Sequence, residues 1–511
     1  MPGTTVLLTL DGIGITEKTA YNAFIEAKTP NIDRLMYEYP CVRGLSAGMA
    51  VGLPNGQSGN AKAGYENIGA GRIVYQQITR INKEIASGAF FQNKALLDTV
   101  SYCRSNDSSL HIVGMLSDGG VHSHTDHIVA LLKLAADNSF GKVYVHCFTD
   151  GRDTGSGLKY IERLQTKMRE LGVGEIATVS GRFYAMDRDN NYDRIKLTYL
   201  AMTQGEGNKA ANAAEAVQAA YDNGETDEFI KPTVIVNGGV PVGAVNDMDA
   251  VIFINIRSDR SRELTRAFCE DEFRMFKRDY RPDIRFVCFD DPDPSIENKV
   301  VAFESQSVEN TLGEYLSLLG LRQLRLTESE NQSNVNVFFD CGVREPFDGV
   351  DRLSVRSAKV KEPGTIKPSM SAPAICDKLT EVIRDSRYDF VLCNISNADV
   401  LGHTCDMDIA VKAMEELDKC VGRIVNAVFE SGAVLFICST HGKIEQLRDY
   451  ETGEPYKCHT SNPVPFILVN YTYDVRLREA GCLADVAPTI LEIMGIPQPK
   501  EMTGKSLINR E

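Results

Sequence analysis

Three side chains in the C-terminal part of the sequence could hold a divalent metal ion. Asp399 and His403 stand four residues apart in "NADVLGHTCD", which places both on one side of a helical turn, and His459 follows in "KCHTSNPVPF". Two imidazoles and a carboxylate suit Mn, Zn or Fe without favouring one of them. A single histidine is more often structural, but the chain has only eight and several fall in this cluster or at predicted strand ends. We therefore expect a metal site, and His441 with Asp11 could form a second position beside it.

A second group of candidate residues is cationic. Arginine suits bidentate recognition of phosphate and carboxylate groups, and arginines gather in "DGRDT", "SGRFYAMDRD" and "NIRSDRSRE". The alternative is a solvated surface with ion pairs to Asp187, Asp189 and Asp259. We favour a pocket for a small, multiply charged anion, and its candidates are Arg152, Asp153, Arg182, Arg188, Arg257, Arg260 and Arg262. A metal site combined with an arginine pocket indicates phosphoryl chemistry.

The predicted strands bring these candidates to common edges. Apolar runs rich in β-branched residues, typical of strands buried on both faces, occur at residues 6–10, 111–116, 142–148, 250–256, 389–395 and 433–440. Apolar residues at helical spacing between Ala410 and Val428 predict a crossover helix. The sequence thus predicts an α/β protein with largely parallel sheets. Ligands collect at the carboxyl ends of such strands, where polar candidates follow all six runs: Asp11, His122, His124, Arg152, Asp153, Arg257, Arg260, Asp399, His403 and His441.

Length, charge and cysteine content limit the class of protein. A chain of 511 residues exceeds the usual size of a single core, so we expect two or more domains, with the polar segment 290–299 as a candidate hinge. A formal net charge of -15 argues against nucleic-acid binding. The 13 cysteines are scattered without CxxC pairs, which indicates a reduced, cytoplasmic setting. No signal peptide or apolar run of membrane-spanning length is visible, so we expect a soluble protein without a membrane partner. The oligomeric state stays open.

A series of motifs resembles the cofactor-independent phosphoglycerate mutases of the alkaline phosphatase superfamily. The motifs are "DGIGI", "NAFIEAKTPNIDRL", "VGLPNGQSGN", "NIGAGRIVYQ", "SDGGVHSH", "DGRDT", "GRFYAMDRD", "NADVLGHT" and "HTSNPVPF", in this order over nearly the whole chain. The resemblance implies an alkaline-phosphatase-like α/β domain formed by residues 1–76 and 308–511, with an inserted α/β phosphotransferase domain at residues 77–307. The family reaction interconverts 3-phosphoglycerate and 2-phosphoglycerate in glycolysis through a phosphoserine, with two Mn ions in most members.

The resemblance also assigns one complete metal site and one complete substrate pocket. The metal ligands are Asp399, His403 and His459. The implied substrate contacts are His122, Arg152, Asp153, Arg182, Arg188, Arg257 and Arg260. We therefore expect a divalent cation, with Mn favoured, and a small phosphorylated three-carbon acid as the ligand.

The catalytic centre departs from the family pattern at three positions. The nucleophile segment reads QMGNSEVGH in the family and "QSGNAKAGY" here, so Ala61 replaces the nucleophilic serine and cannot accept a phosphoryl group. The second metal position would contain Asp11 and His441, but ADHGN has become "STHGK", so Thr440 replaces a carboxylate ligand. Asn331 aligns with a lysine that the family uses near the transferring phosphate. We expect one tightly bound ion and an impaired second site.

Three functional hypotheses follow from these departures. The first is a pseudoenzyme that binds metal and a phosphoglycerate-like ligand but has lost most or all mutase activity. The second is an enzyme, either a functional mutase with an altered nucleophile such as Ser58 or a weak single-metal phosphatase. The third is a structural partner of an active homologue. We favour the first, because in-line transfer tolerates little displacement of the attacking atom.

Overall fold

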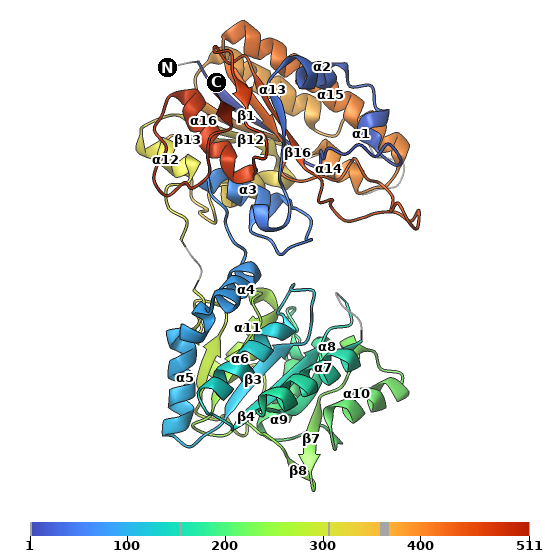
Figure 1. The fold of residues 1–511 in the computed structure, drawn as a ribbon, viewed down its shortest axis with the longest axis vertical. Helices are drawn as coiled ribbons and strands as arrows, with labels where there is room; N and C mark the ends of the chain where they lie inside the picture. The colour runs from blue at the N-terminus through green and yellow to red at the C-terminus, as the bar shows by residue number, and fades with distance from the viewer. Residues whose placement is uncertain (1–2, 153–155, 305–306, 358–366, 510–511) are drawn as a thin grey trace. The chain divides into compact units, whose positions relative to one another are not determined.

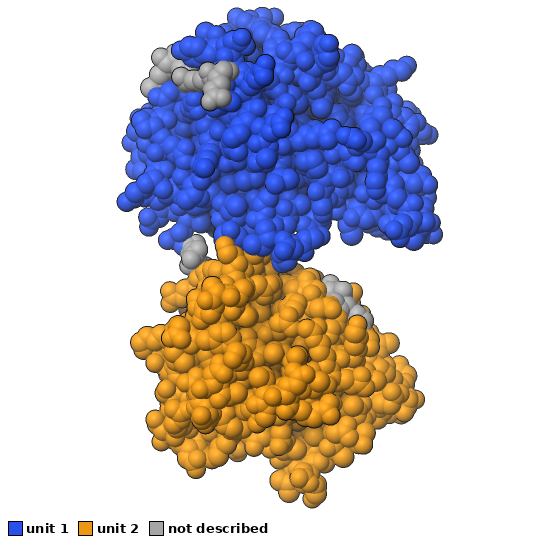
Figure 2. Space-filling model, viewed as in Figure 1, with its two compact units in different colours: residues 1–76, 307–511 blue, residues 77–306 orange. Residues whose placement is uncertain are grey.

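The chain forms two compact units in the computed structural model, which describes residues 3–152, 156–304, 307–357 and 367–509. Unit 1 comprises Met1–Gln76 and Ser307–Glu511, and unit 2 comprises Gln77–Gln306 (Figures 1 and 2). None of the helices in the described part of the chain has the length and apolar character needed to cross a membrane. All 13 cysteines are free thiols.

Unit 1 contains a sheet whose five adjacent strands are parallel and whose last two pairings are antiparallel. Its strands, in spatial order, are β13 (Val350–Val355), β12 (Gln323–Glu328), β14 (Phe390–Ile395), β1 (Thr5–Leu10), β15 (Val434–Cys438), β16 (Val464–Val469) and β2 (Cys41–Gly44). A separate pair joins β17 (Arg476–Leu477) and β18 (Ile508–Asn509). The parallel order places β14 and β15, both from the C-terminal part of the chain, on either side of β1.

Helices cover both faces of this sheet (Figure 1). Val6 and Leu8 of β1 belong to one apolar core with α13 (Ala372–Asp385) and α15 (Met407–Ser431), and Leu7 faces a second core with α3 (Ala61–Ala70). The helix predicted between Ala410 and Val428 is α15, which confirms the crossover between β14 and β15. The other helices of unit 1 are α1 (Ala23–Glu26), α2 (Pro30–Glu38), α12 (Leu312–Leu318), α14 (Asn397–Gly402) and α16 (Val486–Met494).

Unit 2 contains a second, mostly parallel sheet. Its strands, in spatial order, are β11 (Lys299–Val301), β10 (Arg285–Cys288), β9 (Ala250–Phe253), β3 (Leu110–Met115), β4 (Val143–Thr149), β5 (Glu175–Gly181), β7 (Thr233–Asn237) and β6 (Asn208–Ala210), with β8 (Val240–Pro241) paired to β7. Its helices are α4 (Gln77–Ser87), α5 (Lys94–Ser105), α6 (Thr125–Asp137), α7 (Gly157–Leu171), α8 (Arg182–Ala185), α9 (Tyr192–Thr203), α10 (Ala213–Asp222) and α11 (Ser258–Cys269). All six runs predicted as strands are strands, so the α/β prediction is confirmed.

The segment 290–299 was expected to be a hinge, and that expectation is wrong. It lies inside unit 2, between β10 and β11. Arg266 of α11 pairs with Asp293 at 2.8 Å (Nη2–Oδ2), which holds the segment against the helix. Asp293 Oδ1 also accepts a hydrogen bond from the backbone N–H of Ser295 at 2.9 Å. Polar residues here close a loop within one unit, and the chain crosses between units at Gln76 and Gln306 instead.

Candidate functional site

The candidate residues of unit 1 lie at the carboxyl ends of three neighbouring strands. Asp11 follows β1, Asp399 lies in α14 directly after β14, and His441 follows β15. The register aligns Leu10 with Ile395, so these strands end side by side. Parallel pairing therefore brings together residues that lie far apart in the sequence, at the edge where ligands bind in open α/β sheets.

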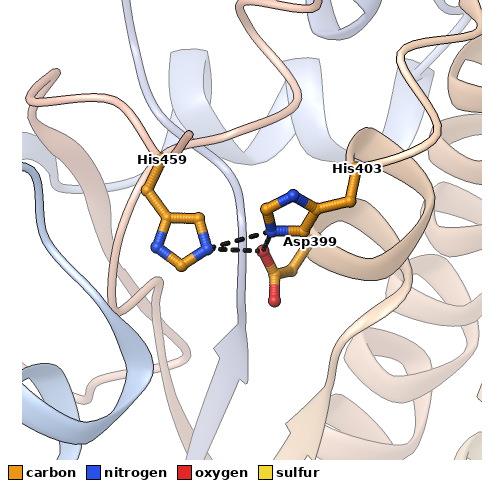
Figure 3. Close-up of side chains that lie close together, drawn as sticks. All are labelled: Asp399, His403 and His459. Atoms are coloured by element: carbon orange, nitrogen blue, oxygen red, sulfur yellow. Dashed lines mark hydrogen bonds and ion pairs between the residues drawn. The ribbon is translucent and has the colours of Figure 1, made fainter. Parts of the chain in front are cut away.

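Asp399, His403 and His459 form the one group of potential metal-binding side chains identified among the described residues (Figure 3). Asp399 Oδ1 lies 3.4 Å from the Nε2 atoms of both histidines, and these two Nε2 atoms are 3.0 Å apart. Burial alone raises a carboxyl pKa, but hydrogen bonds from the surrounding imidazoles hold the pKa of Asp399 well below its usual range. Two imidazoles and an ionised carboxylate, all pointing at one place, fit a divalent transition metal.

The loop before α3 orients one of these ligands. His459 Nδ1 lies 2.9 Å from the carbonyl oxygen of Gly59. Since a carbonyl only accepts, Nδ1 carries a proton, and Nε2 is the ring nitrogen that faces Asp399 and His403. A metal-binding histidine is commonly held in this way, by a hydrogen bond from its other nitrogen.

Glu445 fastens the ligand-bearing loops together. Its side chain is fully buried and accepts from four donors. Oε2 binds the backbone N–H groups of Gly14 at 3.0 Å and Lys443 at 2.8 Å, while Oε1 binds Asn462 Nδ2 at 3.0 Å and the Thr460 hydroxyl. These donors come from the loops that carry Asp11, His441 and His459. Sequence reasoning missed Glu445, because a lone glutamate without a ligand-like spacing gives no signal.

Asp11 sits in a network of neutral donors. Thr440 Oγ1 donates to Oδ1 at 2.7 Å, and Oδ2 accepts from Asn394 Nδ2 at 2.9 Å and from the Tyr65 hydroxyl at 3.1 Å. Burial raises the pKa of the Asp11 carboxyl. His441, which the sequence paired with Asp11, directs its Nε2 at Asp399 Oδ1 at 3.1 Å. The contributions of Tyr65 and Asn394 were not predicted, since both act through long-range contacts.

Ala61 is the first residue of α3 and lies beside this network. Asn60 caps the helix by accepting from the Ala63 backbone N–H at 2.9 Å. The helix passes so close to Thr440 that a Cβ placed on Gly64 would lie 2.5 Å from Thr440 Cβ. The helix start is thus capped by Asn60 and packed near Thr440, and position 61 presents a methyl group.

Asn331 and Ser58 lie in separate loops of unit 1. Asn331 follows β12 and donates through Nδ2 to Ser396 Oγ at 2.7 Å and to Glu328 Oε1 at 3.1 Å. Asn331 therefore tethers its loop to the end of β14. Ser58 is half-buried in the loop before Asn60.

The cationic candidates of unit 2 follow its parallel strands. His122, Arg152, Arg182 and Arg257 come after β3, β4, β5 and β9 in turn, which places them at one edge of the sheet. The buried Arg182 donates to Asp150 Oδ1 at 2.5 Å through Nη1, and its Nη2 lies 2.8 Å from His122 Nε2. Asp153 lies outside the described residues.

Asp259 forms ion pairs with two arginines of this group, Arg257 and Arg188. Its Oδ2 lies 3.0 Å from Arg257 Nη2 and 3.4 Å from Arg188 Nη1. Arg260 donates to the Met186 carbonyl at 2.9 Å, and burial together with the charges of Arg188 and Arg182 lowers its pKa. Arg260 thus lies close enough to the other two guanidinium groups to be repelled by their charges.

Neighbouring carboxylates neutralise part of the positive charge of these arginines. Arg152 pairs with Glu228, and Asp259 serves Arg188 and Arg257 together. Asp187 instead pairs with Arg194 at 2.8 Å. The ion pairs foreseen as the alternative to a pocket are thus present for Asp259, while the arginines still converge at the strand ends.

Comparison with known proteins gives the family. The model described as "BPG-independent PGAM N-terminus" matches residues 81–293, within unit 2. A 2,3-bisphosphoglycerate-independent phosphoglycerate mutase from Lachnoclostridium phytofermentans is 51% identical over 507 residues, covering 99% of this chain and 98% of the relative. The enzyme of the same name from Acetivibrio thermocellus is 51% identical and covers 98% of each chain.

A solved structure agrees with this assignment. Crystal structures of Leishmania mexicana phosphoglycerate mutase at low cobalt concentration include a chain that is 27% identical. The match has a TM-score of 0.67 and covers 100% of this chain and 98% of the other. The chain therefore belongs to the family of 2,3-bisphosphoglycerate-independent phosphoglycerate mutases.

Proposed function

We propose that this protein is a member of the mutase family that has lost most or all mutase turnover and that binds one divalent cation in unit 1 and a phosphoglycerate-like anion in unit 2. The observation that carries the proposal is the methyl group of Ala61 at the start of α3. A methyl group has no lone pair with which to attack phosphorus, so no phosphoserine can form there.

Asp399, His403 and His459 would hold the cation, with Mn favoured among divalent metals. A cation bound there would polarise a phosphoryl oxygen as a Lewis acid. The protein's own part is to aim the ligands: Gly59 fixes the ring of His459, and Glu445 holds the loops that carry the ligands. Thr440 and Ala61 offer no anionic ligand for a second cation near Asp11.

His122, Arg182, Arg188, Arg257 and Arg260 would bind the phosphate and carboxylate groups of a phosphorylated three-carbon acid. Charge-assisted hydrogen bonds contribute about 1.5–3 kcal/mol each before ordering costs. A few such contacts support micromolar to millimolar affinity. The free thiols fit the cytoplasmic setting that we assign to the protein.

The direct test is conversion of 3-phosphoglycerate to 2-phosphoglycerate with added Mn, with the Acetivibrio thermocellus relative as positive control. We expect no conversion above background and no phosphoserine in the intact mass. Turnover comparable to the relative, or stoichiometric phosphate on Ser58, would instead establish the functional mutase with an altered nucleophile.

Ligand binding is tested separately by calorimetry with 3-phosphoglycerate. We expect a dissociation constant between micromolar and millimolar, weakened at least fivefold by Arg257→Ala. The matched control is Arg274→Ala, since the Arg274 side chain is 83% exposed and pairs only with the similarly exposed Glu272 among the described residues. Absence of heat at millimolar ligand would favour the structural-partner hypothesis.

A further inference from the structure

A short loop of unit 2, residues 186–191, carries Arg188 into the group of cationic candidates. It joins α8 to α9. The charge of Arg188 contributes to the lowered pKa of Arg260 on α11, so the two guanidinium groups repel each other. Asp259 offsets part of this repulsion, but Arg257 shares the same carboxylate oxygen. Other contacts must therefore hold the loop close to α11.

Two side chains of α11 bind the backbone of this loop. Arg260 donates to the Met186 carbonyl at 2.9 Å, and Glu263 Oε1 accepts from the backbone N–H of Asn190 at 3.0 Å. Glu263 is buried, with 1% of its surface exposed. The two side chains stand three residues apart on the helix and therefore lie on one face of it. Together they hold the loop on either side of Arg188.

The contact of Glu263 complements the hydrogen bonds inside the loop. Asp187 Oδ1 accepts from the backbone N–H groups of Asp189 at 2.9 Å and Asn191 at 2.8 Å. The N–H between them, that of Asn190, goes to Glu263 instead. Asn190 has a φ of 63°, a left-handed conformation that asparagine adopts more readily than most residues. Glu263 thus fixes the one residue of the turn that points its N–H toward α11.

We propose that Glu263 is a positioning residue of the anion pocket, which keeps Arg188 beside the other guanidinium groups by holding Asn190. This inference rests on the anion binding proposed above. It adds a residue that acts only through the loop and makes no contact with the anion itself. A loop that is held in place before binding spares the complex the entropic cost of ordering its arginine.

Two substitutions of Glu263 separate its acceptor oxygen from its charge. Burial raises the pKa of this carboxyl group and the charge of Asp187 adds to the rise, although the hydrogen bond from Asn190 opposes it. A negative charge is thus disfavoured at this position, and the acceptor is what the loop requires. Glu263→Gln keeps an acceptor oxygen without the charge, whereas Glu263→Leu keeps a good helix former without any acceptor.

Calorimetry with 3-phosphoglycerate measures the effect on binding. Glu263→Leu should weaken the affinity about three- to tenfold, because binding must then order Arg188, and Glu263→Gln should stay within about twofold of the unmodified protein. Thr265→Val is the matched control, since Thr265 is buried on the same helix and donates to the Ser261 carbonyl at 2.9 Å. Equal affinities for the leucine and glutamine variants would overturn the inference.

Removal of the Arg188 side chain tests whether Glu263 acts through it. In an Arg188→Ala protein, the further change Glu263→Leu should cause little additional loss of affinity, because the side chain that the loop positions is gone. The same several-fold loss with and without Arg188 would show a general structural effect and contradict the positioning role.

Hydrogen exchange without ligand separates this inference from the proposed function. Amides of residues 188–191 should exchange faster in Glu263→Leu than in Glu263→Gln or the unmodified protein. If the leucine variant does not fold, the Asn190 amide of the unmodified protein decides, and exchange as fast as in an unstructured peptide would contradict the anchor. Unchanged loop exchange in the leucine variant would overturn the inference and leave 3-phosphoglycerate binding standing. Failure of the unmodified protein to bind 3-phosphoglycerate would overturn the proposed function, and the role of Glu263 in the pocket with it.

Discussion

At the scale of single residues, the buried carboxylate of Glu445 holds together the loops of the candidate metal centre. All of its partners are donors, and its two oxygens join the segments that follow β1 and β15 to the segment that precedes β16. A buried acceptor with four donors is costly to alter, since any donor left unpaired in the interior loses its hydration without compensation. The centre therefore depends on a residue that touches no expected ligand.

Replacement of Glu445 should damage stability and cation binding together. In Glu445→Gln an amide N–H group faces donors, so we expect a loss of about 1–3 kcal/mol in unfolding free energy and a roughly tenfold weaker Co²⁺ affinity. Urea unfolding and cobalt titration measure the two effects. Glu451→Gln, at an exposed position in the same region, is the control and should change neither. Normal cobalt affinity in the Glu445→Gln variant would refute the positioning role.

Substitution of Ala61 tests whether the missing serine alone explains the proposed loss of mutase activity. Ala61→Ser restores a hydroxyl at the start of α3, yet Thr440 and Asn331 remain neutral residues held in other hydrogen bonds. We expect this variant to fold normally and to form no phosphoserine when incubated with 3-phosphoglycerate and Mn. Intact-mass measurement detects the added phosphate. A phosphorylated variant would mean that one substitution accounts for the whole defect.

The grouping of the candidate metal ligands could be predicted from the sequence. The residues that hold the surrounding side chains and loops in place could not. Asp399 and His403 are four residues apart, a spacing that is visible in one dimension. Tyr65 and Asn394 reach Asp11 across 54 and 383 residues, and no local pattern encodes such contacts. Glu445 is likewise recognisable only from its partners. Interactions between distant segments are properties of the folded chain.

At the scale of elements, apolar runs identified six strands that are almost entirely buried, but the equally buried β12, β5 and β16 were not predicted. Very short strands such as β8 and β18, of two residues each, carry no periodic pattern and escape this kind of prediction. The sheet of unit 2 also contains a polar chain that no pattern predicted. Asp249 contacts His111 Nε2 at 3.1 Å, and His111 Nδ1 lies 3.0 Å from His146 Nε2. Thr178 Oγ1 completes the chain, 2.9 Å from His146 Nδ1.

These buried histidines should make unit 2 sensitive to acid. Burial, with a smaller contribution from His124, lowers the pKa of His127 to about 3, and burial beside His111 lowers the pKa of His146 well below its usual range. An unfolded histidine titrates near pH 6.5. Between about pH 6.5 and pH 3 the unfolded chain therefore binds protons that the folded unit does not, so stability is full above this range and falls as the pH falls.

The free energy of unfolding of unit 2 should fall by up to about 1.4 kcal/mol per pH unit for each such histidine. Hydrogen exchange of α6 and β4 at pH 7 and pH 5 measures it in the intact chain. His127→Gln, which can still donate to Asn82 Oδ1, should reduce the slope. A slope that is the same with and without His127 would contradict the assignment.

At the scale of the whole molecule, the two units should respond to different ligands. The candidate cation ligands all belong to unit 1, and the described arginine candidates belong to unit 2. A ligand at 100 times its dissociation constant stabilises the unit that binds it by about 2.7 kcal/mol.

Hydrogen exchange in the full chain resolves the two responses. Co²⁺ should slow exchange in the β1, β14 and β15 region and leave unit 2 unchanged, and 3-phosphoglycerate should do the reverse. Inorganic sulfate serves as a control for unspecific anion effects. Protection of both units by either ligand alone would contradict independent binding.

The position of β1 between β14 and β15 has a consequence for biosynthesis. β1 leaves the ribosome before both of its neighbours, which begin at Phe390 and Val434. At about 5–20 residues per second, the strand waits on the order of 20 to 90 s for both partners. Unit 2 is complete at Gln306 and can fold in the meantime. The nascent chain must therefore keep an apolar strand shielded during translation, and a metal ion has no finished site to enter until His459 has emerged.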